Sequence, residues 1–371
     1  MTAHPASYLF RKTLPAAKAT AEEFGWLQVA GRLQVPALLG RTRLDAHTDV
    51  ITYEHVFASG RCRFLLGDLI SLADHGRANP SEAASLIDVV CDDLIAAATT
   101  TGRTMPLSAC VPALYTDRIR PAGRVDTWYL NSNLTLPDAD TGERVSVASL
   151  ASYTATLNDT PVLIDVPAAI DAARTALHPD SQWATALTQG DPTEPNIAAS
   201  ADGACWLDFE YAGCNTLAGE IANLLWYLFA LGGWLVPTYQ PDVYSRTLSQ
   251  HLLPVTLPAV EHAELSARHR RLDIHSAWHV GPGRHAALTR LLTRLTTDLG
   301  EAAALPSEQP LHALTPFLTL RILGVIPPHL LTTADLLLLL AKLGQVQHLQ
   351  DGSAFTHTRL TTDIASPVET P

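Results

Sequence analysis

The first part of the chain holds two short runs of apolar, aromatic and β-branched residues that are typical of β-strands, with one helical stretch between them. Residues 8–11 are apolar and aromatic, and residues 50–57 (VITYEHVF) are β-branched and aromatic, so both predict strands. Residues 20–29 predict a helix with Glu22 and Glu23 in its first turns. Residues 60–69 predict another short strand and the start of a helix.

From residue 81 onward the pattern becomes mainly helical. Residues 81–99 and 167–177 have apolar positions at helical spacing, and Ser81 is a plausible N-cap. Residues 104–138 have weak periodicity and predict an irregular excursion, while residues 145–153 fit either a helix or a strand. A loop-like block at 188–196 precedes a strand at 205–209, and helix is predicted from there to about residue 350. The chain therefore predicts an α+β fold, with a small mixed N-terminal part and a large helical remainder.

Composition narrows the possible functions. The chain has 371 residues and a formal net charge of -12, so a nucleic-acid-binding surface is not expected, and a cationic co-substrate would suit the charge. The five cysteines show no C-x-x-C spacing and predict reduced residues of a cytoplasmic protein rather than a zinc site.

Two apolar runs are candidates for membrane spans, residues 217–236 and 334–343. The first contains Glu220 and Asn223, and the second is shorter than the roughly 20 residues that a span needs. Both predict core helices, and no membrane partner or secretory signal is expected.

The strongest chemical signal is a pair of polar motifs. Residues 189–197 read QGDPTEPNI and residues 207–210 read LDFE, which places Asn196 five positions and Asp208 17 positions after Asp191. Phosphoryl transfer needs a carboxylate to orient the accepting hydroxyl and oxygen ligands to hold magnesium on the phosphates. One Asp, one Asn and a second Asp supply that set.

These motifs resemble the aminoglycoside phosphotransferase and choline kinase family. The family's catalytic loop reads H-G-D-x-x-x-x-N or H-N-D-x-x-x-x-N, and its metal motif reads I-D-F/W-E/D. The continuation through Asn223 is similar to the choline kinase signature D-F-E-Y-x-x-Y-N followed by F-D-x-x-N. Here Cys214 stands at the Tyr, Gly219 at the Phe and Glu220 at the Asp.

The resemblance implies roles for individual residues of this site. Asp191 would be the catalytic base, Asn196 and Asp208 would bind Mg2+, and Glu210 would support a second metal ion or its water shell. Gln189 replaces a His that usually braces the loop, and a Gln side chain can both donate and accept hydrogen bonds.

The resemblance also assigns residues of the N-terminal part. Lys12 would neutralise the phosphates of ATP or GTP, with Glu22 or Glu23 as its helix partner and Lys18 as a less favoured alternative. The main chain of Glu54, His55 and Val56 would face the nucleotide base.

The implied architecture is a protein-kinase-like fold of two lobes. Residues 1–58 would form a truncated N-terminal lobe without the Gly-rich loop. Residues 59–350 would form a mainly helical C-terminal lobe, and residues 351–371 a flexible tail.

Several side chains have simpler interpretations. Lys12 could be an ordinary solvated lysine, and Glu22 and Glu23 could simply favour the helix dipole. Trp226 and Tyr227 could line a cationic-substrate pocket, but such residues are more often core. Three histidines could form a metal site but lack a clear third ligand, and they are interpreted as surface or cleft residues: His275, His279 and His285.

The sequence therefore predicts a phosphotransferase that moves the terminal phosphate of ATP or GTP to a hydroxyl of a small molecule. The acceptor would be an aminoglycoside-like compound, a sugar or an amino alcohol. Serine-hydrolase, zinc-protease and dinucleotide fingerprints are absent from the sequence. The competing hypothesis is a catalytically weak pseudokinase that binds a nucleotide or another ligand.

Overall fold

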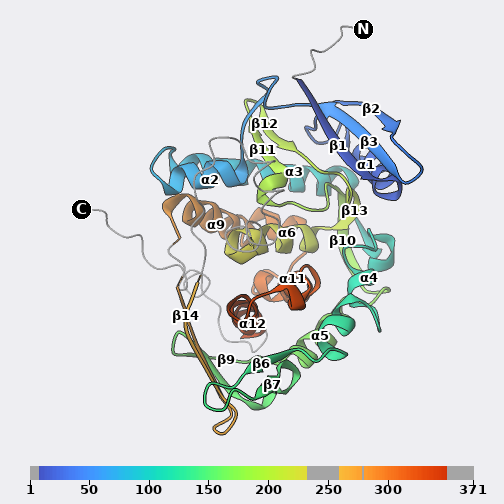
Figure 1. The fold of residues 1–371 in the computed structure, drawn as a ribbon. Helices are drawn as coiled ribbons and strands as arrows, with labels where there is room; N and C mark the ends of the chain where they lie inside the picture. The colour runs from blue at the N-terminus through green and yellow to red at the C-terminus, as the bar shows by residue number, and fades with distance from the viewer. Residues whose placement is uncertain (1–7, 232–258, 278–279, 349–371) are drawn as a thin grey trace.

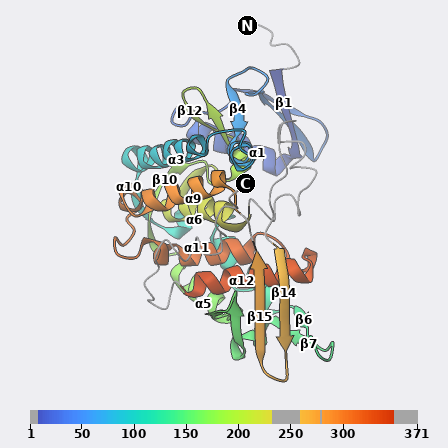
Figure 2. The ribbon, with the colours of Figure 1, turned by 90° about the vertical axis from the view of Figure 1, so that its left-hand side faces the viewer.

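The protein has a mixed α/β architecture of small sheets and many helices (Figure 1). The computed structural model describes residues 8–231, 259–277 and 280–348. The N-terminal sheet lies at one end of the molecule, helices fill the middle, and a four-stranded sheet lies at the opposite end (Figures 1 and 2).

The N-terminal sheet has three antiparallel strands in the order β1-β3-β2. These strands are β1 (Leu9–Pro15), β2 (Leu38–Arg43) and β3 (Thr48–Glu54), and helix α1 (Ala16–Val29) follows β1 directly. The central strand buries Ile51 and Tyr53 at alternate positions, as a strand with one covered face should. The two strands and the helix predicted here are confirmed, whereas β2 was not predicted because its sequence, LLGRTR, does not alternate.

One strand and two helices follow the N-terminal sheet in the chain. They are β4 (Cys62–Leu65), α2 (Leu66–Asp74) and α3 (Pro80–Thr101). The prediction of Ser81 as an N-cap is wrong: Asn79 is the cap, and its side chain accepts a 3.0 Å hydrogen bond from the Ser81 N–H. Pro80 explains the difference, because proline fits the first position of a helix and moves the cap one residue before it.

An irregular stretch follows, as predicted for residues 104–138. It holds only short elements: β5 (Arg103–Pro106), a 3-10 turn (Leu107–Ala109), α4 (Thr116–Ile119), a π-helical turn (Asp126–Leu130) and β6 (Thr135–Pro137). Residues 145–153, which fitted either a helix or a strand, divide between β7 (Arg144–Ser146) and a 3-10 helix (Val147–Ser152). Strands β8 (Thr154–Leu157) and β9 (Thr160–Val162) then lead to the predicted helix α5 (Val166–Ala176).

Two small sheets carry the segment with the chemical motifs. One has the order β13-β10-β5 and the other β12-β11-β4, and their remaining strands are β10 (Gln182–Thr188), β11 (Ile197–Ser200), β12 (Gly203–Trp206) and β13 (Gly213–Thr216). A short 3-10 turn (Glu194–Asn196) leads into β11. Strand β12 ends at Trp206, so Asp208 lies in the loop after the strand rather than on it.

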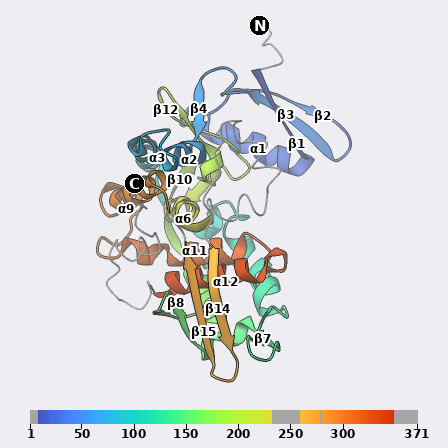
Figure 3. The same ribbon diagram turned by 60° about the vertical axis from the view of Figure 1, so that its left-hand side comes forward.

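The prediction of nearly continuous helix after residue 209 is wrong. Helix α6 (Leu217–Trp226) and a π-helical turn (Tyr227–Leu231) are present, but β14 (Ala259–Ser266) and β15 (Arg271–Ala277) form an antiparallel hairpin. The hairpin adds to β8 and β9 in a sheet of order β14-β15-β8-β9, where Leu272 and Ile274 alternate into the core. Figure 3 shows the two long strands beside α12.

The remaining helices complete the core. They are α9 (Pro282–Leu295), α10 (Asp298–Ala302), α11 (Pro310–Gly324) and α12 (Thr333–His348), with a 3-10 turn (Pro328–Leu330) before α12. Helix α11 lies against α6, and α9 packs along α3 and α2. In the described ranges no helix combines the length and apolarity needed to cross a bilayer. The rest of the apolar run after Leu231, and the predicted tail at 351–371, lie outside the described residues.

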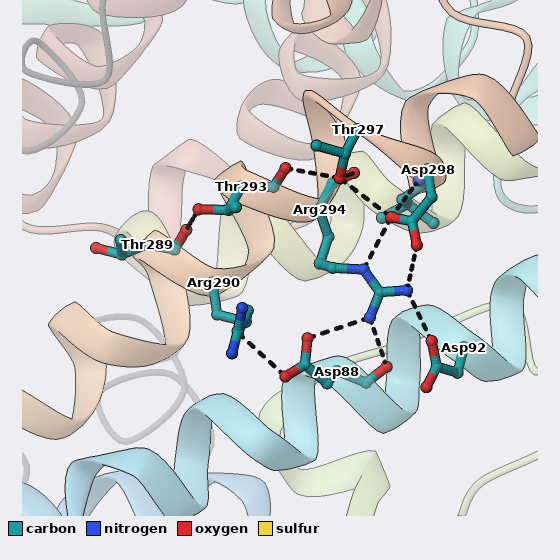
Figure 4. A network of polar contacts seen from close by, with 9 residues as sticks. Asp88, Asp92, Thr289, Arg290, Thr293, Arg294, Thr297 and Asp298 are labelled. Carbon is teal, nitrogen blue, oxygen red and sulfur yellow. Dashed lines mark hydrogen bonds and ion pairs between the residues drawn. The ribbon is translucent and has the colours of Figure 1, made fainter.

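An ion-pair network fastens α9 to α3 (Figure 4). Arg294 donates to Asp88 of α3 at 3.1 Å, to Asp92 of α3 at 2.7 Å and to Asp298 at 2.8 Å. Arg290 adds a second contact to Asp88, at 3.1 Å.

Candidate functional site

The segment between β10 and β11 is held in place by Gln189. Its side chain is fully buried, and its amide donates to the carbonyl oxygens of Leu207, at 2.8 Å, and Asp208. Its side-chain oxygen accepts from the Asp191 N–H at 2.9 Å. One amide therefore ties the Asp191 loop to the Asp208 loop, using both its donor and its acceptor.

Gly190 is required by the backbone at this point. It has φ +90°, and a Cβ there would lie 2.0 Å from the carbonyl oxygen of Tyr211. Both the left-handed conformation and the close approach exclude a side chain. The Gly190 N–H also donates to the buried carboxylate of Glu220 at 3.2 Å.

The Asp191 carboxylate is oriented from two sides. Its Oδ1 accepts from Asn223 of α6 at 2.8 Å and from Arg321 of α11 at 3.2 Å. Its Oδ2 lies 3.3 Å from the Asn196 side-chain nitrogen, which also donates to the Asp191 carbonyl at 2.9 Å. Asp191 keeps an exposed side-chain fraction of 24%, so a ligand can reach it.

A buried ion pair anchors the middle of the same loop. Arg284 of α9 meets Glu194 through two contacts, at 2.5 and 3.2 Å, and both side chains are buried. Arg284 also donates to the carbonyl oxygens of Tyr227 and Leu228. A two-point contact of this kind fixes the direction of the loop as well as its position.

Lys12 joins three segments that are far apart in the sequence. Its ammonium lies 2.8 Å from Glu22 Oε2 on α1 and 2.6 Å from Asp208 Oδ1. The Tyr53 hydroxyl donates to the other Glu22 oxygen at 3.1 Å. Asp208 has φ +60°, a conformation that few residues other than glycine adopt, and this turns its carboxylate toward Lys12.

Electrostatics at this cluster follows from burial and from the neighbouring charges. Burial, together with the Asp208 charge, raises the pKa of Glu22 to about 7 even though Lys12 opposes the shift. For Asp208, desolvation acts to raise the pKa, but the Lys12 ammonium and a Glu22 hydrogen bond hold it below its ordinary value. For Lys12, desolvation lowers the pKa, but the two carboxylates outweigh it and the net shift is upward.

The structure separates the alternatives among the predicted residues. Glu23 lies against Arg41 at 3.0 Å and Lys18 against Glu210 at 2.8 Å, whereas Glu22 contacts Lys12. The geometry therefore brings Lys12 and Glu22 together and leaves Glu23 and Lys18 in other contacts.

The main chain predicted to face the nucleotide base is largely engaged inside the protein. The Glu54 N–H donates to Ala37 O at 2.9 Å, and the His55 N–H donates to Tyr8 O at 2.7 Å. The carbonyl of Val56 accepts from the Cys62 N–H at 2.9 Å. A base placed beside this segment would meet the remaining groups only.

A magnesium ion would find suitable donors beside Asp208. The Leu207 N–H donates to Asn196 O at 2.8 Å, so the segments bearing Asn196 and Asp208 are joined next to their side chains. Carboxylate and amide oxygens are the ligands that Mg2+ takes, with phosphates and water completing its shell. Within the described ranges, no three His, Cys, Asp or Glu side chains gather to hold a metal unaided.

Four side chains that contact the Asp191 loop have no role predicted from the sequence: Asn223, Arg321, Arg284 and Glu194. A signal existed for Asn223, because Glu220 and Asn223 are three apart and share one face of α6, from which both reach the Gly190–Asp191 segment. Arg321 lies 130 positions from Asp191, and Arg284 90 positions from Glu194, so no local pattern indicates those contacts.

The remaining candidates have ordinary surroundings. Trp226 is fully buried and packs 6.4 Å from the Phe229 ring, in agreement with a core role. His285 is exposed on α9, His275 is half-buried beside His262 on the hairpin, and His279 lies outside the described residues.

Comparisons with known proteins give structural neighbours only. No known protein family and no curated protein matches the sequence. Solved structures of a glucosamine kinase are similar to this chain. Crystal form A is 16% identical to this chain and superposes with a TM-score of 0.44. The match covers 97% of this chain and 76% of the glucosamine kinase chain. A complex with glucosamine, ADP and inorganic phosphate shares 14% identity and a TM-score of 0.41, over 93% of this chain and 71% of that one. Likeness at this level assigns no activity, so function is argued from the residues of the chain.

Proposed function

We propose that this protein is a small-molecule phosphotransferase with a protein-kinase-like arrangement of two lobes. Residues 1–58 would form the smaller lobe and residues 59–350 the larger. The observation that carries the proposal is Lys12 held between Glu22 and Asp208, because these three residues come from β1, α1 and the loop after β12. A lysine fixed by a helix carboxylate beside a metal-binding aspartate is the arrangement that phosphoryl transfer from a nucleotide uses.

The remaining residues complete the proposed reaction centre. Asp191 would accept the proton of the acceptor hydroxyl as that oxygen bonds to the terminal phosphorus, and the bond from this phosphorus to the nucleoside diphosphate breaks. Asn223 and Arg321 orient the Asp191 carboxylate, and Gln189 holds the Asp191 and Asp208 loops in register. Asn196 and Asp208 would hold Mg2+, which would neutralise charge on the phosphates.

The experiment that tests this proposal measures nucleotide binding and turnover separately. Thermal shift with ATP and magnesium is measured for the wild type and for Asp208→Ala, and repeated with GTP. A stabilising, magnesium-dependent shift is expected for the wild type and a much smaller one for the variant. Absence of any nucleotide-dependent shift in the wild type would contradict the proposal.

Turnover is followed as nucleoside diphosphate release with a panel of hydroxyl compounds, including sugars, amino alcohols and aminoglycosides. Asp191→Ala is expected to retain the nucleotide shift and to lose turnover by about 10³-fold or more, since both the base and its positioning are removed.

A second candidate is a ligand-binding pseudokinase. The occupied main-chain groups of Glu54, His55 and Val56 favour it, because they leave fewer contacts for a nucleotide base. Nucleotide binding without turnover on any acceptor, unchanged by Asp191→Ala, would select this candidate.

A further inference from the structure

Arg118 of α4 is a buried cation without an anionic partner. Only 6% of the residue is exposed, and within the described part of the chain its single hydrogen bond runs from Nε to Ala113 O at 3.0 Å. One terminal nitrogen, Nη1, is buried and has no hydrogen-bond partner there. An unpaired buried guanidinium costs several kcal/mol, so a folded protein normally keeps one only when something else compensates it.

A second arginine lies beside it. Arg321 is also 6% exposed, and the Arg321 contact to Asp191 is its only hydrogen bond in the described ranges. The helices that carry the two arginines, α4 and α11, are in contact, and a Cβ on Gly324 of α11 would lie 3.5 Å from Arg118 Cδ. Burial and the Arg321 charge lower the pKa of Arg118 to about 10, so Arg118 stays charged at neutral pH.

The end of α11 does not explain Arg118. The carbonyl of Gly324 accepts from a third arginine, Arg124, at 2.9 Å, and the Arg124 guanidinium lies over the Trp128 ring. Arg124 therefore supplies the cation that a helix C-terminus favours. Arg118 makes no hydrogen bond to α11.

Carboxylates near the pair do not balance it. Asp191 is shared between Arg321 and Asn223. Burial raises the pKa of Glu220 to about 7, so this group is only partly ionised at neutral pH. Glu194 is held by Arg284. The region beside Asp191 therefore carries an excess of positive charge, opposite in sign to the whole chain.

The orientation of the Asp191 carboxylate places the excess positive charge on the side where the acceptor would bind. Its Oδ2 faces Asn196, on the proposed metal side, while its Oδ1 faces Arg321. A hydroxyl held at this carboxylate would extend the rest of its molecule either toward the nucleotide or toward the arginines. The nucleotide side is occupied during the reaction, so the acceptor body belongs beside Arg321 and Arg118.

We propose that Arg118 and Arg321 form an anion-binding subsite, and that the acceptor is a hydroxyl compound with a carboxylate or phosphate group. Sugar acids, other hydroxy acids and sugar phosphates have this chemistry. The proposal rests on the phosphotransferase function and narrows its acceptor. It replaces the cationic co-substrate that net charge suggested with an anionic one.

The test compares acceptors that carry an acid group with related compounds that lack one. Binding to the full-length protein is measured by calorimetry for glycerate against glycerol, gluconate against glucose, and glucose phosphate against glucose, with glucosamine as the cationic compound. Inorganic phosphate separates phosphate recognition from recognition of a carboxylate. At least one acid is expected to bind tenfold or more tightly than its neutral counterpart.

Three variants locate the effect. Arg118→Met is expected to abolish the preference for acids while leaving the unliganded melting temperature equal or higher, because an uncompensated charge is removed. Arg118→Lys keeps the charge and is expected to retain part of the preference. Arg124→Met, which removes a neighbouring cation, is expected to leave the preference intact.

Two results would overturn the anion subsite. One is neutral or cationic compounds binding as tightly as the acids, and the other is Arg118→Met with an unchanged preference. The ATP–magnesium shift is measured in the same samples. Arg118-dependent binding of acids without a nucleotide shift would retain the subsite and reject the phosphotransferase function, so the two failures are distinguishable.

Discussion

Lys12 holds the Asp208 carboxylate, the group that a magnesium ion would also need. Nucleotide binding would therefore transfer Lys12 from Asp208 to the phosphates while Glu22 keeps the lysine in place. Lys12 is only 21% exposed, so its orientation is fixed by these contacts rather than by solvent.

Replacing Lys12 by Met is expected to weaken ATP binding by about tenfold or more, because one charge-assisted contact of about 1.5–3 kcal/mol is lost. The matched control is Lys18→Met. Lys18 is a half-exposed lysine of α1 that contacts Glu210. Calorimetry with ATP and magnesium compares the two. Equal losses in both variants would show that Lys12 has no special role.

Glu220 predicts a pH dependence of stability. Burial raises its pKa from 4.5 to about 7, so the folded state holds this proton more tightly than the unfolded state. Its contribution to stability is full below about pH 4.5 and is lost as the pH rises to about 7, by at most about 3 kcal/mol. Glu22, whose pKa is also raised to about 7, adds a slope of the same sign.

The Glu220→Gln variant should show a shallower fall in the free energy of unfolding between pH 4.5 and 7, measured by urea denaturation. A Gln there can still accept from the Gly190 N–H. Glu22→Gln is the parallel variant, and the double variant should be flattest. An unchanged slope in all three would contradict the assignment.

Residue types in the two motifs predicted Asp191, Asn196 and Asp208 as candidate site residues, because the three lie in neighbouring loop and turn segments whose spacing is local. The sequence pattern did not predict the arginines that contact the Asp191 loop. Arg284 reaches Glu194 from α9 and Arg321 reaches Asp191 from α11, and their own neighbours in the sequence show no pattern that marks them.

At the scale of elements, the Asp191 loop is fastened to α9 by a buried pair. Arg284→Met would leave the Glu194 carboxylate buried and unpaired, at an expected cost of about 3–5 kcal/mol. The double variant Glu194→Leu with Arg284→Met should recover much of that loss, since both charges are removed. Chemical denaturation measures both. A double variant as unstable as the single one would show that the pair itself stabilises the fold.

The α3–α9 contact depends on a more exposed network. Arg294 is 13% exposed and bridges three carboxylates, so Arg294→Met is expected to lower the free energy of unfolding by about 1 kcal/mol. The stability of this variant should also depend less on salt concentration than that of the wild type. Arg290→Met removes one pair from a 45% exposed side chain and should change stability by less than about 0.5 kcal/mol. Thermal melts at low and high salt separate the two; an effect of Arg290→Met equal to that of Arg294→Met would contradict this ranking.

Elements with strong local periodicity were predicted, and those stabilised by distant partners were not. Helix α3 has 22 residues of helical pattern, whereas the β14–β15 hairpin is completed by the parallel partner β8, more than 100 positions earlier. Sheet pairing over such a separation is not encoded in the pattern of either strand alone.

At the scale of the whole molecule, α1 packs so closely against the Asp208 loop that a side chain at Gly25 would not fit. A Cβ on Gly25 would lie 2.0 Å from Phe209 O and 3.1 Å from Ala212 Cβ. This contact joins the N-terminal sheet and its helix to the segment that bears Asp208, and it sets the distance from Glu22 to that aspartate.

Gly25→Ala is therefore expected to destabilise the protein by about 1–3 kcal/mol and to weaken ATP binding, although alanine favours a helix. The control Phe24→Ala changes the preceding residue of α1, which is 61% exposed, and should affect neither property strongly. Chemical denaturation measures the stability of the two variants, and calorimetry measures their ATP binding. A Gly25→Ala protein that is as stable as the wild type would show that α1 can shift freely.

Net charge describes the whole molecule and not its parts. The chain carries -12, yet buried Arg321 contacts Asp191, and a second buried arginine, Arg118, lies on the adjoining helix α4. The total for the chain therefore does not predict the local charge next to the Asp191 carboxylate, which Arg321 contacts.

Gln189 gives the site one more property. Its amide keeps the same donor and acceptor at every pH, whereas an imidazole in that position would gain a proton in mildly acidic solution and lose its acceptor. The tether between the Asp191 and Asp208 loops should thus persist in acid, and any loss of activity there would come from the carboxylates.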